Sequence, residues 1–166
     1  GFGPPMQGFY QLKWGDKDAL TQAFESPTTA AIILEPVQGE GGCRATPDED
    51  LRWMREMADK HGVLIIFDEV QCGMGRTGKL WAHEWAGMTP DIMAVAKALG
   101  GGFPIGACLA TAEAASGMTA GAHGSTFGGN PLAMAVGKAA FSTIASDEIM
   151  NNVNEIAGYL KQQFAG

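Results

Sequence analysis

Short apolar runs, each ending in a polar residue, proline or lysine, are the feature that most constrains the fold. They are bounded like strands and are shorter than a typical helix. Residues 30–36 read as a strand buried on both faces, because the run is continuously apolar and is stopped by Pro36. Residues 63–69 and 92–96 predict two further strands, and a fourth is expected at residues 105–111.

Helix signals alternate with these runs. Thr-Pro-Asp-Glu at residues 46–49 combines a capping box with proline at the first helical position, and predicts a helix over residues 47–60. Asp16 is placed to cap a short earlier helix. A later helix is expected over residues 130–146, and an apolar stripe over residues 149–160 predicts another. Strands that alternate with helices indicate an α/β sheet, in which ligands gather at the carboxyl ends of the strands.

Charge and composition limit the possible partners. The chain has 166 residues, 46% of them hydrophobic, and a formal net charge of -7. This is enough apolar material for the core of one domain, and an acidic chain makes nucleic acid or an anionic membrane a poor partner. No apolar run approaches the length of a membrane span. The three cysteines lack metal-site spacing and suit reduced thiols, so we expect a cytoplasmic protein that acts on small molecules and holds no metal.

Lys97 is the most informative single residue. It directly follows the apolar run 92–96 and precedes three consecutive glycines at 100–102, so we expect it at the edge of a dry core. Burial there would disfavour the ammonium and leave the neutral amine that attacks an aldehyde. The alternative is a lysine whose stem lies on the core while its head reaches water.

Asp68 lies near the end of the run 63–69. The next predicted strand along the chain, residues 92–96, leads to Lys97. A pyridoxal ring requires such an anion, because a buried carboxylate keeps the pyridinium nitrogen protonated. Taken alone, an aspartate at the end of a strand is more often a loop cap. Its pairing with Lys97 favours the cofactor interpretation.

Residues 123–130, with the sequence His-Gly-Ser-Thr-Phe-Gly-Gly-Asn, supply hydroxyls and bare backbone amides just before a predicted helix. This is the composition of an anion cradle, and Thr126 is a candidate donor to a phosphate. Taken alone, a loop of this kind is a flexible connection in most proteins. We leave His123 without a role.

Five motifs occur in an order that resembles the class III aminotransferases of the fold-type I pyridoxal-phosphate enzymes. They are EPVQGEGG at 35–42, FDEVQCGMGRTG at 67–78, PDI at 90–92, AKALGGG at 96–102 and HGSTFGGNP at 123–131. The resemblance implies a three-layer α/β sandwich with a mostly parallel sheet and helices on both faces. Residues 1–166 would form a partial large, cofactor-binding domain, with the N-terminal part and the small C-terminal domain absent.

The resemblance also implies which residues would hold the ring of pyridoxal 5'-phosphate. Lys97 would form the Schiff base with the cofactor and carry the proton that is moved during the reaction. Asp68 would pair with the ring nitrogen. Val70 would pack on one face of the ring, and Gln71 would reach the ring hydroxyl.

Three further residues take roles from the same resemblance. Ser125 and Thr126 would bind the cofactor phosphate, with Thr126 serving the cofactor of the neighbouring subunit, so a homodimer is implied. Glu40 resembles the gate residue of the family, which occupies a substrate-binding arginine when the second substrate does not need it. The alternative for Glu40 is a solvated loop glutamate.

Within the family, Gly39-Glu40-Gly41-Gly42 together with residues 68–78 look closest to the acetylornithine and succinylornithine aminotransferases. An enzyme of the acetylornithine type would imply a role in arginine biosynthesis. The resemblance implies transfer of a terminal amino group from N-acetylornithine, or a similar ω-amino acid, to 2-oxoglutarate. A pyridoxal-phosphate-dependent aminomutase of the same fold and a catalytically silent fragment are the alternatives. For the 166-residue chain alone we expect weak cofactor binding and no turnover.

Overall fold

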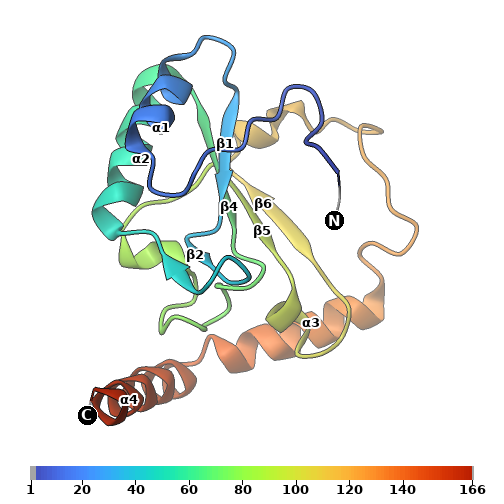
Figure 1. Ribbon diagram of the computed structural model, residues 1–166. Coiled ribbons are helices and arrows are strands. Elements are labelled where there is room, and N and C mark those ends of the chain that lie inside the picture. The colour runs from blue at the N-terminus through green and yellow to red at the C-terminus, as the bar shows by residue number, and fades with distance from the viewer. Residues whose placement is uncertain (1–2, 166) are drawn as a thin grey trace.

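A four-stranded sheet is the centre of the computed structural model, which describes residues 3–165. Its strand order is β1-β4-β5-β6, formed by Ala31–Leu34, Leu64–Asp68, Ile92–Val95 and Ala107–Ala110. β4 pairs in parallel with both β1 and β5, whereas β6 runs antiparallel to β5 (Figure 1). The four predicted strands and the mostly parallel sheet are therefore confirmed.

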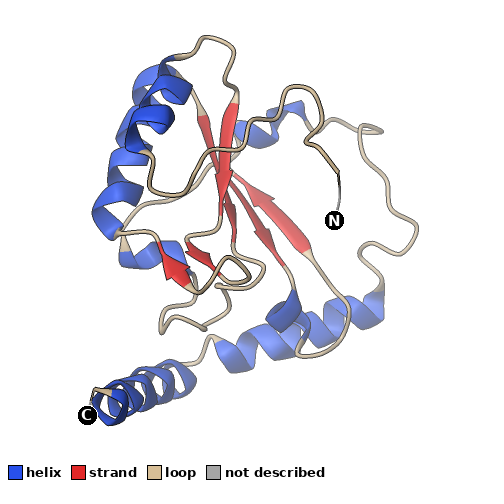
Figure 2. Ribbon diagram, in the orientation of Figure 1, coloured by secondary structure: helices blue, strands red, loops and turns tan. Residues whose placement is uncertain are grey.

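Two helices cover one face of the sheet. They are α1, Lys17–Glu25, and α2, Asp48–His61, and they lie side by side along β1 and β4 (Figure 2). Asp16 caps α1 as predicted, because its Oδ1 accepts a hydrogen bond from the backbone N–H of Ala19 at 3.0 Å. α2 ends at Gly62 in the left-handed conformation, with a φ of 68°.

The capping box predicted for α2 is wrong. Pro47 occupies the N-cap position, and no side-chain hydrogen bond caps the helix. The first turn is closed instead by the Pro47 carbonyl, which accepts from the backbone N–H groups of Asp50 and Leu51 at 2.9 and 3.1 Å. Thr46 therefore lies one residue outside the helix, where its backbone N–H donates to the Pro36 carbonyl.

The core lies between β4 and the two helices. Ile65 and Phe67 alternate along β4 and have no exposed surface, while Leu64, Ile66 and Asp68 on the opposite face are half-buried. The helices contribute Phe24, Leu51 and Ala58 to the same cluster. Burial of aromatic and aliphatic side chains of this size stabilises a fold by about 1.5–3 kcal/mol each.

The expectation that the first strand is buried on both faces is wrong. β1 is at one end of the strand order, and Ile33 is 63% exposed. At the other end, all four residues of β6 are exposed. Among residues 3–165 these two strands each have a single strand neighbour, and the face of the sheet away from α1 and α2 has little cover.

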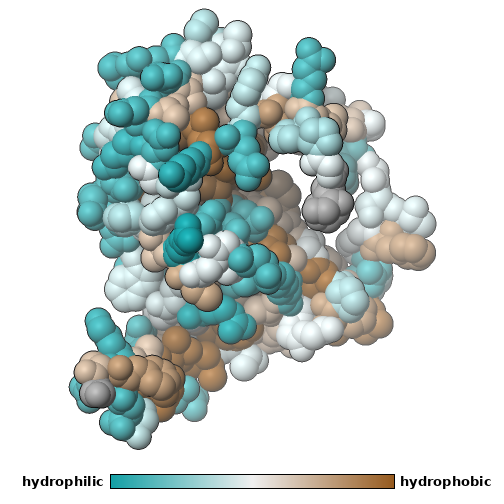
Figure 3. All heavy atoms as spheres, in the orientation of Figure 1, coloured by the Kyte–Doolittle hydropathy of each residue, from teal (hydrophilic) through white to brown (hydrophobic). Residues whose placement is uncertain are grey.

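The C-terminal part consists of α3, Pro131–Ile144, and α4, Asp147–Phe164, as predicted. Asn130 caps α3 by accepting from the Ala133 N–H at 2.9 Å, and Ser146 caps α4. α3 packs against η2, the short 3-10 helix Lys97–Gly100 that follows β5. Apolar side chains remain on the surface of both helices (Figure 3), among them Leu132, Met134, Phe141, Ile156, Tyr159, Leu160 and Phe164.

Shorter elements join these parts. The hairpin β2–β3 comprises Val37–Gln38 and Arg44–Ala45, and the 3-10 helices η1 and η3 comprise Ala82–Trp85 and Ala114–Gly117. Within residues 3–165, none of the helices combines the length and the apolar character that a membrane span requires.

Candidate active site

The predicted site residues follow the ends of two neighbouring parallel strands. Asp68 is the last residue of β4, and Lys97 comes two residues after the end of β5. Asp68 lies opposite Ala94 in the strand register, and the backbone N–H of Glu69 donates to the Ala94 carbonyl at 2.9 Å. Because parallel strands end at the same edge of a sheet, Asp68 and Lys97 are brought to one edge.

The backbone at Lys97 turns its side chain out of the strand pattern. Continued alternation would place Lys97 on the face of Met93 and Val95, which are buried. Lys97 instead has a φ of 46° and begins η2. Left-handed backbone at a residue other than glycine costs about 1–2 kcal/mol and is concentrated at functional sites.

The predicted burial of Lys97 is wrong, because the turn into η2 leaves the side chain exposed. Its Nζ donates a hydrogen bond to the side-chain Oε1 of Gln71. The interpretation in which the stem lies near the core and the head reaches out describes this lysine better. The amine is held by a neighbouring side chain and is accessible to a ligand.

Gln71 is itself packed against the tip of the β2–β3 hairpin. A Cβ atom on Gly39 would lie 1.9 Å from the Gln71 Nε2, so a larger residue at position 39 would displace the Gln71 amide from this place. The turn is closed by hydrogen bonds from Gly42 and Cys43 to the Gly39 carbonyl, both at 3.1 Å. Glu40 follows Gly39 and is exposed, so the hairpin tip brings it to the neighbourhood of Gln71 and Lys97.

Asp68 and Val70 form a local turn at the end of β4. The Asp68 Oδ1 accepts from the Val70 N–H at 2.9 Å, and both residues are half-buried. Asp68 alternates with the buried Phe67, so its side chain lies on the sheet face away from α1 and α2. A carboxylate has a second oxygen, which is available to accept from a ligand.

The structure does not bring Ser125 and Thr126 together with the other predicted site residues, Lys97, Gln71 and Asp68. Both are exposed in the long segment that runs from β6 to α3 along the outside of the sheet (Figure 1). The Ser125 Oγ accepts from the Gly128 N–H at 2.9 Å, within its own loop. These two residues are presented outward from this chain.

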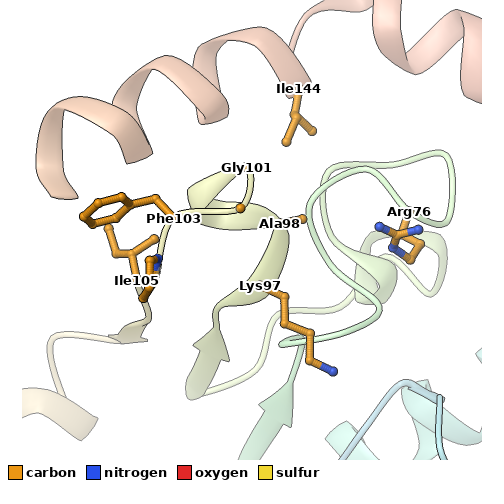
Figure 4. A pocket seen from close by; sticks show the side chains of 9 residues that line it. Arg76, Lys97, Ala98, Gly101, Phe103, Ile105 and Ile144 are labelled. Carbon is orange, nitrogen blue, oxygen red and sulfur yellow. The ribbon is translucent and has the colours of Figure 1, made fainter.

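A cavity of about 590 Å³ lies between η2 and the end of α3. Its lining includes Arg76, Gly101, Phe103, Ile144 and the stem of Lys97. Figure 4 shows the Lys97 side chain pointing away from Gly101 and Ile144. Lys97 both lines this cavity and donates to Gln71, so the cavity adjoins the candidate site.

One buried polar cluster was missed by the sequence-based reasoning. Glu69 and His83 form a hydrogen-bonded pair with a distance of 2.8 Å between the Glu69 Oε1 and the His83 Nδ1, and both side chains are buried. Strand alternation was an available signal for Glu69, because it must point opposite to Asp68. Nothing in the sequence marked His83 as its partner.

This cluster shifts the pKa values of two of its members. Burial alone would raise the pKa of the Glu69 carboxyl, but hydrogen bonds from His83 and Ala82 hold it below its ordinary value. Burial, followed by repulsion from Glu69, raises the pKa of the Cys72 thiol to about 12. Cys72 is therefore a neutral thiol and a poor nucleophile near neutral pH.

Comparison with known proteins adds a second line of evidence. Residues 11–165 match the family model described as aminotransferase class-III. The chain is 66% identical to acetylornithine aminotransferase 2 of Caulobacter vibrioides and 61% identical to acetylornithine aminotransferase of Brucella melitensis biotype 1. These matches cover 100% and 99% of the chain but 41% of each relative, so the chain spans about two-fifths of their length.

Solved structures agree with this assignment. The crystal structure of N-acetylornithine aminotransferase from Stenotrophomonas maltophilia matches with a TM-score of 0.82 and 41% identity, covering 96% of this chain and 43% of that one. A structure of ornithine delta-aminotransferase from Plasmodium falciparum matches with a TM-score of 0.88 and 36% identity, covering 93% and 40%. The predicted fold class is confirmed, and the chain belongs to the class-III aminotransferases.

Proposed function

We propose that the protein containing this chain is a pyridoxal-phosphate-dependent aminotransferase that moves a terminal amino group from N-acetylornithine, or a similar ω-amino acid, to 2-oxoglutarate. The observation that carries this proposal is the amine of Lys97, held by Gln71 beside the strand end that bears Asp68. The names of the relatives support the donor, since those with 53–66% identity are acetylornithine aminotransferases.

The residues present suit pyridoxal 5'-phosphate. An accessible amine is required for the aldehyde, and Lys97 supplies one. Asp68 uses one oxygen for the Val70 N–H, and its other oxygen is the natural acceptor for the protonated ring nitrogen. When bound, the cofactor supplies a ring that withdraws electrons from the substrate carbon.

The chain's own groups then have distinct tasks. Lys97 holds and moves a proton at its Nζ, and Gln71 orients that amine while remaining in reach of the ring hydroxyl. Val70 offers an aliphatic face against which a ring packs. Glu40, exposed at the hairpin tip beside this group, is a suitable partner for a cationic side chain near the substrate.

The outward-facing loop and the exposed helices support a homodimer. Ser125 and Thr126 are not joined to the Lys97 group of their own chain, so we assign Thr126, with Ser125, to the phosphate in a neighbouring subunit. Leu132, Phe141 and Tyr159 leave apolar surface on α3 and α4 that another surface can cover. We further propose that the chain is part of a large cofactor-binding domain and that the protein works in the cytoplasm.

A product assay tests the reaction. The intact protein, with any residues that precede or follow this chain, is incubated with pyridoxal phosphate, N-acetylornithine and 2-oxoglutarate, and glutamate is measured. We expect glutamate only when donor and acceptor are both present, and a lower rate with ornithine or 4-aminobutyrate as the donor.

Omission of 2-oxoglutarate separates the aminotransferase from an aminomutase. Conversion of the donor to an isomer without an acceptor would contradict the proposal. Lys97→Arg and Lys138→Arg are matched variants, since both keep a positive charge at an exposed lysine position. Only the Lys97 variant should lose activity.

A further inference from the structure

Glu69 is a buried carboxylate that lies between two residues of the candidate site but faces away from both. Strand alternation directs its side chain into the core, whereas Asp68 and Val70 flank it on the chain. Its side chain has no exposed surface. The proposed chemistry of Lys97 and Asp68 makes no use of this carboxylate.

Three of the four hydrogen bonds to the carboxylate tie the start of one loop to its end. Oε1 accepts from the backbone N–H and the ring Nδ1 of His83, at 3.0 and 2.8 Å. Oε2 accepts from the backbone N–H of Ala82 at 2.9 Å and from the Cys72 thiol at 3.5 Å. Residues 69–83, which we name the Glu69 loop, are thereby closed into a ring.

The backbone of this loop is packed tightly around the carboxylate. The Gly73 N–H donates to the Glu69 carbonyl at 3.0 Å, and a Cβ on Gly73 would lie 2.7 Å from the same oxygen. Gln71 lies within this closed turn, two residues after Glu69 and two before Gly73. The backbone of Gln71 therefore lies inside a turn that Glu69 closes, and its side chain packs against Gly39.

Space filling alone does not account for a charged group at this point. A buried charge carries a large desolvation cost, and an apolar side chain of similar volume often stabilises a fold as well or better. Hydrogen bonds to a carboxylate differ from apolar contacts because they are directional and fix orientation. Four such contacts on one side chain hold the adjoining backbone in a single arrangement.

We propose that Glu69 is a positioning residue, which keeps Gln71 against the Lys97 amine through the hydrogen bonds that close the Glu69 loop. The proposal deepens the proposed function, because it assigns a cause to the placement of the amine that reacts with the cofactor. His83, in η1 at the end of the loop, acts with Glu69 as the side-chain donor. Neither residue touches the cofactor or the substrate in this account.

Chemical labelling of Lys97 tests this without using enzyme activity. The intact protein, freed of cofactor, is treated with limiting acetic anhydride, and acetylation of Lys97 is measured by peptide mass spectrometry relative to the exposed Lys138. The bond from Nζ to Gln71 restrains the amine, so its loss should raise labelling. We expect Glu69→Gln to raise the ratio at least about threefold, the effect of losing one hydrogen bond of ordinary strength.

Two further variants test whether Glu69 affects the labelling of Lys97 through Gln71. Gln71→Ala should raise the ratio by a similar factor, and Glu69→Gln should add nothing to it in that background. Val63→Ala, which truncates a core residue 2% exposed before the start of β4, should lower the melting temperature without changing the ratio. An unchanged ratio in folded Glu69→Gln, or an equal rise in Val63→Ala, would overturn the proposal.

A second pair of variants serves if Glu69→Gln does not fold. His83→Asn keeps a side-chain donor close to the position of Nδ1 and should leave the ratio near that of the unchanged protein. His83→Ala removes the donor and should raise it, and equal ratios in the two would also overturn the proposal. The labelling result is independent of the cofactor, so a failed assignment of Lys97 to the cofactor would be recognised separately in the product assay.

Discussion

The end of β4 with the Glu69 loop and the segment from β6 to α3 carry the two halves of the expected cofactor site, and they are built differently. In the first, Phe67 and Glu69 are fully buried, and Gln71 is held between Gly39 and Lys97. In the second, all of β6 is exposed and Phe127 is 80% exposed. The first half is made by packing within this chain, whereas the second lies exposed on its surface.

Truncation of one phenylalanine in each region gives the largest contrast. Phe67→Ala removes a fully buried ring and should lower the free energy of unfolding by about 3–5 kcal/mol. Phe127→Ala removes a ring that is 80% exposed and should change it by less than about 0.5 kcal/mol. Urea unfolding followed by circular dichroism measures the free energy of unfolding of both variants. Comparable losses in the two would contradict the difference between the two regions.

Substitution at Asp68 should separate chemistry from folding within the first region. Asp68→Asn keeps an oxygen that accepts from the Val70 N–H but loses the negative charge opposite the ring nitrogen. We expect the turnover rate of the intact protein to fall about a hundredfold or more, with the melting temperature nearly unchanged. The exposed Asp18→Asn is the control, and an equal rate in both variants would remove Asp68 from the site.

Thr126 tests the outward-facing half. Thr126→Ala should leave the free energy of unfolding within about 0.5 kcal/mol but weaken the binding of pyridoxal phosphate to the intact protein roughly tenfold, because one hydrogen bond to the phosphate is lost. Thr119→Ala changes another exposed threonine of the same segment and should not affect binding. Titration of cofactor fluorescence measures both dissociation constants. If the two variants bind alike, the segment has no part in holding the phosphate.

The smallest effect concerns acid stability in the first region. The folded state holds the pKa of Glu69 below the ordinary value of 4.5, so the folded protein binds this proton less readily than the unfolded chain. The contribution of the Glu69 carboxylate to stability is complete above about pH 4.5. This contribution is lost as the pH falls through the lower pKa that Glu69 has in the folded protein. The free energy of unfolding should therefore decline less steeply below about pH 4.5 in Glu69→Gln. Parallel curves for the two proteins would contradict this assignment.

The sequence was most informative where local patterns decide the structure. The apolar runs and the caps at Asp16 and Asn130 predicted the strands and helices to within a few residues, because these features depend on neighbours in the chain. Burial was predicted less well, since it depends on what covers each strand. Ile33 reads as a core residue in the sequence, but β1 is at one end of the strand order.

Lys97 and His83 show the same limit at the site. The left-handed backbone at Lys97 breaks the alternation that the run 92–96 predicts, and no residue nearby in sequence signals that turn. His83 meets Glu69 across a loop, so only the three-dimensional closure of residues 69–83 reveals the pair. The order of motifs identified the family, whereas the positions of individual side chains required the fold.

Reduction of the cofactor-loaded intact protein with borohydride, followed by peptide mapping, shows which lysine binds the cofactor. Borohydride fixes the cofactor to whichever amine holds it, and the modified lysine is then identified by mass. We expect a pyridoxyl group on Lys97. A pyridoxyl group on Lys79 or Lys138, with Lys97 unmodified, would contradict it.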